Sequence, residues 1–251
     1  MGIHAYLEHD VLFAGVDRAL VQRLVEAAGT QSYVRGSTLW RIGEYPQALL
    51  FVRSGLVKLT RPAARGRTAV CGLFGAHSIL GELVLVKGMP YQNAATAATS
   101  NVVVISIPRP LVLEGVRTDP QLALNLFGAF EAKFTALNDK IDVLSAGSVE
   151  ARLATMLLKL YTQFGDELAD GTLRVGVPLS RQELADMVST SVETAIRVLA
   201  RWEREGTLVS DADGFTVGDL AGLQRLSGNF PSSDEPAVTL EQTEKNCGYL
   251  A

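Results

Sequence analysis

The sequence predicts an α+β fold in three parts. Residues 1–119 form a β-rich domain, residues 120–148 a long helix with a hinge, and residues 149–226 a helix-turn-helix followed by a β hairpin. Three patterns predict these parts: apolar runs separated by glycines, a helical repeat of apolar residues, and capping signals on either side of a short turn. A chain of 251 residues is long enough for one large domain or two ordinary ones, and 47% hydrophobic content supports sizeable cores.

The N-terminal part is expected to consist of short strands. From about residue 13 to residue 104, apolar runs alternate with glycines, among which the following lie 6 to 12 residues apart: Gly36, Gly43, Gly55, Gly66, Gly75, Gly81 and Gly88. Such spacing suits antiparallel strands that close into a sandwich or barrel. The segment ALLFVRSGLVKLTR, which begins at Ala48, indicates two strands joined by a turn at Ser54 and Gly55. An all-β domain of unrelated function is the alternative at this point.

A long amphipathic helix follows this domain. Pro120 suits its first turn. Seven residues then follow a 4-3-4-3-4-3 spacing, the a/d pattern of a coiled coil: Ala123, Phe127, Phe130, Phe134, Leu137, Ile141 and Leu144. A continuous seam of this length favours a parallel homodimer over a core within one domain. Residues 145–148 interrupt the helix, and we expect them to act as a hinge between the two domains.

Two capping signals define a helix-turn-helix in the C-terminal part. Ser180 and Glu183 form a capping box that starts one helix. Thr190 and Glu193 offer a second capping box for the next helix, which Gly206 ends. The following segment, LVSDADGFTV, contains two short β-prone runs around an Asp-Gly turn and predicts a hairpin. A helix-turn-helix followed by such a hairpin is a winged helix.

The second helix separates an apolar face from a mixed one. Its inner face comprises Ala195, Val198, Leu199 and Trp202. Its outer face near the N-terminal end comprises Val192, Glu193, Ile196 and Arg197. This end of a recognition helix meets base edges, where an Arg can bind guanine, a Glu can accept from cytosine, and apolar side chains can touch thymine methyl groups. The simpler interpretation is an i,i+4 surface pair of Glu193 and Arg197.

The charge of this region is not strongly basic. Residues 149–226 hold eight Lys and Arg against twelve Asp and Glu. The basic residues are nevertheless concentrated, because Arg201 and Arg204 follow Arg197 on the same helix and Arg181 opens the helix before it. We expect Arg181 and Arg201 to help in binding DNA. Nonspecific affinity should be modest and its salt dependence shallow.

The segment from Leu179 to Gly206, with the hairpin after it, resembles the DNA-binding domain of the cyclic-AMP receptor protein/FNR family of bacterial transcription regulators. The glycine-rich β domain resembles the cyclic-nucleotide-binding jelly roll of that family, and the resemblance covers about nine-tenths of the chain. It implies a sequence-specific homodimer on an inverted-repeat DNA operator, with RNA polymerase as a further partner. The pattern V-E-T-x-x-R resembles the FNR branch, which implies a TGA half-site core. Ile196 departs from the Ser of that branch, so the outer base pairs stay open.

The same resemblance implies an effector pocket in the β domain. Members that bind cyclic AMP carry a Gly-Glu-Leu turn, an Arg-Ser pair that holds the phosphate, and a Thr-Ser pair at the purine. The corresponding residues here are Gly81, Glu82, Leu83, Gln92, Asn93, Leu137 and Asn138. Gln92 cannot supply the charge-assisted bonds that an anionic phosphate needs. We therefore expect weak or absent cyclic-AMP binding and a structural role for Glu82, with a cyclic-nucleotide-responsive regulator of atypical pocket as the alternative.

Other cofactors and an enzymatic function find little support in the residues. Two cysteines, Cys71 and Cys247, cannot hold an iron-sulfur cluster. His4, His9, His77 and Cys71 are candidate haem ligands, but none lies in a haem motif. No metal site and no catalytic constellation is expected. A β-roll protein that binds a ligand or another protein, and not DNA, is the alternative from a different class.

The remaining expectations concern location and the C-terminus. No apolar run approaches the length of a membrane span, and the first ten residues lack the layout of a signal peptide. With only two cysteines, a reducing cytoplasm is the expected compartment. Residues 227–251 are polar and acidic without periodicity, which predicts a disordered tail.

Overall fold

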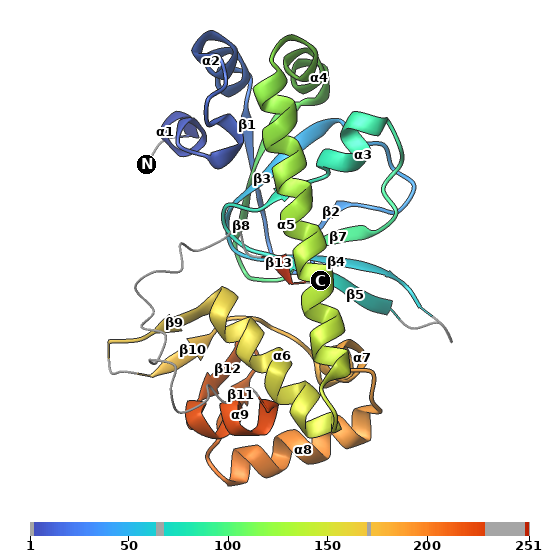
Figure 1. The fold of residues 1–251 in the computed structure, drawn as a ribbon, viewed down its shortest axis with the longest axis vertical. Helices are drawn as coiled ribbons and strands as arrows, with labels where there is room; N and C mark the ends of the chain where they lie inside the picture. Colours follow the sequence, from blue (N-terminus) through green and yellow to red (C-terminus); the bar gives the residue numbers. More distant parts are fainter. Residues whose placement is uncertain (1–2, 64–67, 170–171, 229–248, 251) are drawn as a thin grey trace.

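The computed structural model describes residues 3–63, 68–169, 172–228 and 249–250. Figure 1 shows a β roll with small helices at one end, a long helix α5 that runs along the roll, and a C-terminal α+β domain below it. The α+β class and the jelly-roll and helix-turn-helix parts predicted from the sequence are confirmed. No helix in the described part of the chain combines the length and hydropathy that a membrane span requires.

Two antiparallel sheets form the β roll. The first has the order β1-β8-β3-β6, with bounds Gly29–Tyr33, Val102–Pro108, Ala48–Ser54 and Ile79–Leu80. The second has the order β13-β5-β4-β7-β2, with bounds Tyr249–Leu250, Thr68–Phe74, Val57–Pro62, Ala94–Ala97 and Thr38–Trp40. Alternate residues of the strands point between the sheets, where Val52 and Val104 are buried, whereas Phe51 is buried on the opposite face of the first sheet.

The predicted turn at Ser54 and Gly55 connects the two sheets. Strands β3 and β4 flank it but belong to different sheets, so the chain crosses from one layer to the other here. Gly55 has a φ of 79°, and a Cβ at this position would press on the carbonyl of Asn101. Only glycine meets both conditions without strain.

Small helices close the far end of the roll. They are α1 (Ile3–Glu8), η1 (Val11–Phe13), α2 (Arg18–Glu26) and α4 (Arg109–Thr118), while α3 (Glu82–Lys87) lies on the side of the roll. Leu7, Leu24 and Val112 from these helices join Phe51 in one apolar core. The first turns of α5 contribute Leu122 to the same core, which anchors the long helix on the roll.

Helix α5 (Pro120–Ser145) is continuous, and Asp119 caps it by accepting a hydrogen bond from the backbone of Gln121. The predicted seam lies on its surface: Phe127, Phe134 and Ile141 are 69%, 57% and 61% exposed. Phe130 and Leu144 are also exposed, whereas the side chain of Leu137 lies outside the described part of the chain. A stripe of large apolar side chains in water indicates a covering partner.

The chain changes direction after α5. Ala146 has an extended backbone, and Ser148 caps α6 (Val149–Phe164) by accepting from the backbone N–H of Ala151 at 3.1 Å. The interruption therefore lies where the sequence predicts a hinge.

In the part of the chain that the structure describes, the C-terminal domain combines α6 and three further helices with a small sheet. The further helices are α7 (Arg181–Met187), α8 (Val192–Arg204) and α9 (Leu220–Ser227). The sheet has the order β11-β12-β10-β9, with bounds Leu208–Asp211, Gly214–Val217, Leu173–Val175 and Gly165–Glu167. Strands β11 and β12 form the predicted hairpin, so the winged helix is confirmed.

The capping box at Ser180 and Glu183 is present, but the second helix starts differently from the prediction. Ser191, not Thr190, caps α8 and accepts from the backbone N–H of Thr194. The reason lies in the turn, where Ser189 adopts a left-handed φ of 52° and the backbone N–H of Thr190 donates to Ala185. Thr190 thus closes the turn, and the cap moves one residue onward.

One apolar core joins the C-terminal domain to the roll. Trp202 is fully buried among Leu153 and Leu199, as the spacing on the second helix predicts. The same cluster includes two residues of the roll, Leu73 in β5 and Leu56 just before β4. The two domains therefore share buried apolar surface in this arrangement.

The prediction of a wholly disordered tail is wrong at one point. Tyr249 and Leu250 pair with Phe74 and Leu73 of β5, at the open edge of the second sheet. An unpaired strand edge attracts any extended segment of suitable length, which composition alone does not reveal. Residues 229–248 and 251 lie outside the described part of the chain.

Candidate nucleic-acid interface and effector pocket

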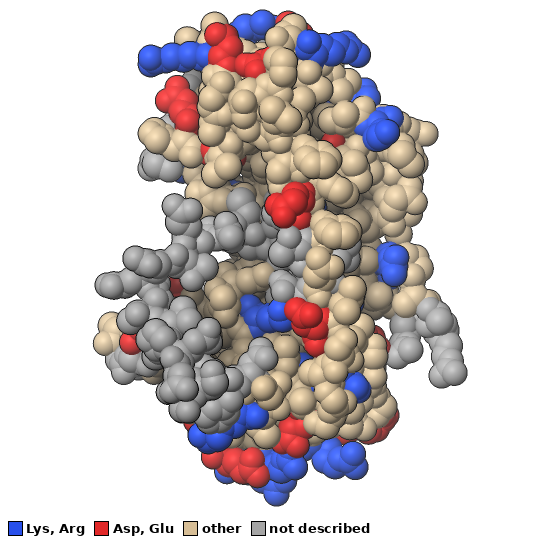
Figure 2. All heavy atoms as spheres, viewed as in Figure 1, with Lys and Arg blue, Asp and Glu red and all other residues tan. Residues whose placement is uncertain are grey.

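The outer face of α8 is open to solvent at its N-terminal end. Glu193 and Arg197 are exposed, and Ile196 is 47% exposed although it is apolar. Val192 is half-buried, so it contributes less to this face than expected. Figure 2 shows acidic and basic side chains intermixed at the end of the molecule that α8 occupies, in keeping with the modest local charge. The arrangement presents hydrogen-bonding groups of both signs around one apolar side chain.

Glu193 and Arg197 have the charge states that base contacts require. Hydrogen bonds from its own backbone N–H and from Ser191 hold the pKa of the Glu193 carboxyl below its usual value, so it is an acceptor at neutral pH. Arg197 forms no ion pair with another described residue. The i,i+4 pair of these two side chains that was the simpler interpretation is therefore not formed.

Arg181 and Arg201 bind within the domain instead. Arg181 pairs with Glu203 at 2.7 Å and donates to the hydroxyl of Ser210, which ties α7 to α8 and to β11. Arg201 pairs with Glu150 at the start of α6. The clustering of arginines in the sequence predicts DNA contacts for both, but their acidic partners come from other elements. A phosphate contact by either arginine stays a prediction, and it requires sharing or breaking these pairs.

Glu82 lies at the first turn of α3 and is only 4% exposed. The Nζ atom of Lys133, on α5, lies 2.5 and 2.6 Å from its two carboxylate oxygens and 5.5 Å from the centre of the Phe74 ring. Burial lowers the pKa of Lys133, and the Glu82 charge opposes that effect. Sequence reasoning missed Lys133; a lysine next to the apolar seam was the available signal. Lys133 is thus the partner through which Glu82 can play the structural role expected of it.

Gln92 and Asn93 stand where the resembled family carries its phosphate-binding Arg-Ser pair. Gln92 is exposed, and its amide donates to the carbonyl of Pro90 in its own loop at 3.0 Å. The backbone carbonyl of Asn93 accepts from the indole N–H of Trp40 at 2.9 Å. Tyr91 is buried and stacks on Trp40 at 4.4 Å. Burial, with Glu44 and Glu82 nearby, raises the pKa of Tyr91 to about 12, so its hydroxyl stays neutral.

The remaining pocket positions lie in different surroundings. Gly81 caps α3 with a φ of 83°, and a Cβ at this position would come within 3.1 Å of the Tyr91 hydroxyl, whereas Leu83 in the first turn of α3 is 50% exposed. Asn138 is exposed on α5, and the side chain of Leu137 lies outside the described part. The structure therefore brings Glu82 to Lys133. The effector pocket as a whole stays a prediction.

The candidate haem ligands lie in different surroundings, and His9 is exposed. His77 lies in a turn and its ring stacks on Tyr6 at 5.0 Å, while Cys71 is half-buried in β5, where burial raises its thiol pKa. Within residues 3–63, 68–169, 172–228 and 249–250, no three His, Cys, Asp or Glu side chains gather as a metal site. The side chain of His4 and the whole of Cys247 lie outside the described part.

Two family models match the chain. The cyclic nucleotide-binding domain matches residues 30–119, and the Crp-like helix-turn-helix domain matches residues 151–226. Between them they cover about two thirds of the sequence. The boundary between the matches contains α5 and the start of α6.

Curated relatives and solved structures agree with these matches. The CRP-like cAMP-activated global transcriptional regulator of Mycobacterium tuberculosis is 27% identical over 85% of this chain and 95% of its own length. The global nitrogen regulator of a Synechocystis strain is 27% identical over 81% of this chain and 90% of its own. The crystal structure of a CRP-family transcriptional regulator from Thermus thermophilus superposes with a TM-score of 0.63 at 27% identity, covering 79% of this chain and 96% of that one. Together with the fold, these similarities show that the chain belongs to the Crp/Fnr family of DNA-binding transcription regulators.

Proposed function

We propose that the protein is a homodimeric regulator that reads an inverted-repeat operator with a TGA core in each half-site. The observation that carries this proposal is the open face of α8, where Glu193, Ile196 and Arg197 stand in solvent while Trp202 on the opposite face is buried. A helix held this firmly on one side presents the other side to the major groove as a rigid unit.

Each exposed side chain has a matching group on a base pair. Arg197 would donate two hydrogen bonds to the O6 and N7 atoms of guanine. Glu193, one turn earlier, accepts from the amino group of cytosine, and Ile196 between them touches a thymine methyl group. These contacts fit a TGA core and its complement.

The second copy of the chain is proposed to cover the apolar stripe of α5. Phe127, Phe134 and Ile141 would otherwise leave large hydrophobic surface in water, and they stand at coiled-coil spacing. Pairing along α5 gives the dimer a twofold axis. The two α8 helices then enter successive turns of the major groove, about 34 Å apart, which is why the operator should be an inverted repeat.

The effector is proposed to be a molecule other than cyclic AMP. Glu82 already has Lys133 as its counter-ion, and Gln92 turns its neutral amide to its own loop. An anionic cyclic phosphate would lose water there without a charged partner, at a cost of about 2 to 5 kcal/mol. The name of the mycobacterial relative calls it cAMP-activated, whereas the name of the Synechocystis relative mentions nitrogen regulation and no cyclic nucleotide. We propose no haem or metal cofactor.

Two wider proposals follow from family membership. The regulator acts in the cytoplasm, where its operators lie. On a promoter it contacts RNA polymerase, and the position of the operator decides between activation and repression.

The test is binding of purified Arg197→Ala protein to an operator duplex, with Arg204→Ala as the matched control. Arg204 is on the same helix and carries the same charge, but its guanidinium donates to the carbonyl of Ala200 near the helix end. Loss of a bidentate guanine contact costs about 1 to 3 kcal/mol, or about 5-fold to 150-fold in affinity. Equal effects of the two substitutions would overturn the base-reading role of Arg197.

A further inference from the structure

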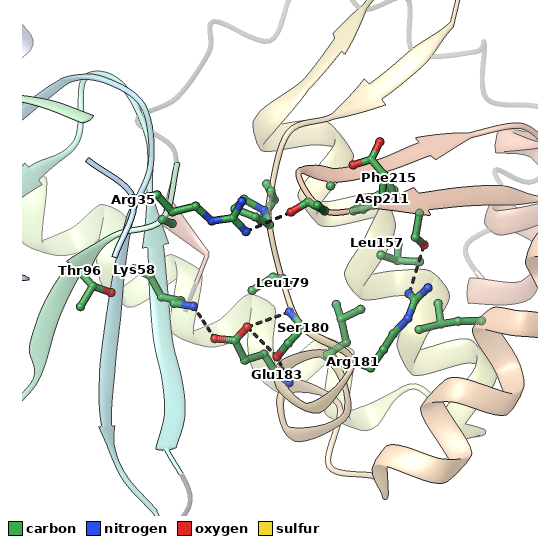
Figure 3. Close-up of a pocket in the computed structure, with 18 of the residues that line it drawn as sticks. Arg35, Lys58, Thr96, Leu157, Leu179, Ser180, Arg181, Glu183, Asp211 and Phe215 are labelled. Carbon is green, nitrogen blue, oxygen red and sulfur yellow. Dashed lines mark hydrogen bonds and ion pairs between the residues drawn. The ribbon is translucent and has the colours of Figure 1, made fainter. Parts of the chain in front are cut away.

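A cleft of about 610 Å³ lies between the β roll and the DNA-binding domain. Figure 3 shows Arg35 and Lys58 extending from the roll across this cleft toward the other domain. The facing wall includes Glu183 of α7 and Phe215 of the hairpin. Polar contacts therefore bridge the cleft at two places.

The first contact joins Lys58 of β4 to Glu183. Their charged atoms are 2.5 Å apart, and the two side chains are only 19% and 20% exposed. The other carboxylate oxygen of Glu183 accepts from the backbone N–H and the hydroxyl of Ser180, both at 2.9 Å. Burial acts to raise the pKa of Glu183, but the hydrogen bonds from Lys58 and Ser180 outweigh it and keep the pKa below its usual value. One carboxylate thus caps α7 and binds the roll.

The second contact joins Arg35 to the tip of the hairpin. Its guanidinium lies 3.1 Å from a carboxylate oxygen of Asp213 and donates to the carbonyl of Ala212, also at 3.1 Å. Arg35 lies in the turn between β1 and β2, far in sequence from the hairpin. The roll therefore contacts both the first helix of the helix-turn-helix and the wing.

These contacts cover a surface that DNA binding needs. In helix-turn-helix complexes the second helix enters the major groove while the first crosses the DNA backbone. Here the first turn of α7 faces β4 across the cleft, and its Glu183 is paired with Lys58 of the roll, so the roll lies opposite this turn in this arrangement. Apolar contacts between the domains are not directional, whereas ion pairs fix one orientation.

We propose that the pairs Lys58–Glu183 and Arg35–Asp213 form an interdomain latch, which holds the DNA-binding domain against the roll and must open before the operator is bound. This inference rests on the proposed DNA-binding function. The break between α5 and α6 at residues 146–148 provides the point about which the domain turns when the latch opens.

The test compares the full-length wild type with Lys58→Met and Glu183→Gln, and uses Lys87→Met as the control. Methionine keeps the apolar stem of lysine, and glutamine can still complete a capping box but lacks the charge. Lys87 is exposed at the end of α3, away from the cleft. Hydrogen exchange of the free protein, read at the backbone amides of residues 180–187, measures the latch without any DNA. Operator affinity in the absence of effector is measured in parallel.

Both latch variants should exchange faster over residues 180–187 than the wild type and the control. They should also bind the operator about 3-fold to 10-fold tighter, the change expected when one partly buried ion pair no longer opposes opening. The double variant should gain no more than either single one, because both remove the same interaction. Unchanged exchange would overturn the latch itself, even for a protein that binds no DNA. Faster exchange with unaltered or weaker operator binding would overturn its inhibitory role.

Discussion

The buried pair of Glu82 and Lys133 gives a quantitative prediction about stability. Replacing Lys133 with Met keeps the stem of the side chain and removes the ammonium, which leaves a carboxylate that is 4% exposed without its counter-ion. Removing one partner of a buried ion pair costs about 3 to 5 kcal/mol. Because Lys133 itself keeps 23% of its surface in solvent, we expect the lower end, about 3 kcal/mol. The additional variant Glu82→Gln, which removes the second charge, should restore most of this loss.

The assay is urea unfolding followed by circular dichroism at one fixed protein concentration, because association also contributes to the apparent stability. Lys87→Met again serves as the control, since Lys87 is exposed and a surface substitution should change the free energy of unfolding by less than about 0.5 kcal/mol. If Lys133→Met lowers the free energy of unfolding by less than about 1 kcal/mol, or if the double variant is as unstable as the single one, Glu82 does not depend on Lys133 as its counter-ion and the reasoning is refuted.

Three further predictions concern association, the C-terminal core and pH. Phe134→Glu should make the protein monomeric in sedimentation velocity, whereas the control Val209→Glu, at an equally exposed site on the hairpin, should leave it dimeric. If both variants sediment as dimers, the α5 interface is contradicted. Trp202→Ala should lower the free energy of unfolding by about 3 to 5 kcal/mol, since Trp202 is fully buried; a loss under about 1 kcal/mol in denaturant titration would speak against this packing. A hydrogen bond from Arg174 lowers the pKa of Asp211 from 3.8 to about 2, so the pair stabilises the fold above pH 3.8 and loses this effect as the pH falls through 2. The Tm difference between wild type and Asp211→Asn should therefore shrink over that pH range. A Tm difference that does not depend on pH would contradict the prediction.

Features that depend on neighbouring residues could be predicted from the sequence. The capping box of Ser180 and Glu183, the hairpin after Gly206 and the α5 stripe all arise from groups a few residues apart. The inner face of α8 followed from helical spacing in the same way. Even here a small error arose at the cap of α8, because the left-handed turn at Ser189 moved the cap from Thr190 to Ser191.

Contacts between distant residues could not be predicted. Lys133 and Glu82 are 51 positions apart, and Lys58 and Glu183 are 125 apart. The arginines of the C-terminal domain illustrate the consequence: local clustering assigned Arg201 to DNA, but Glu150 comes from the start of another helix. Which charged side chains pair depends on how distant helices and strands pack against one another. Residue patterns within a short stretch of sequence do not reveal that packing.

The central claim is that α8 reads a TGA-type inverted repeat without cyclic AMP. The most direct measurement is binding of the purified protein to a labelled duplex that carries TTGAT and ATCAA half-sites separated by about four base pairs. A scrambled duplex serves as control, and the titration is run at fixed salt with and without cyclic AMP. The account predicts tight, selective binding that the nucleotide leaves unchanged. Selectivity that requires cyclic AMP would contradict the assignment of the effector pocket, and equal binding to both duplexes would contradict the half-site and the reading face of α8.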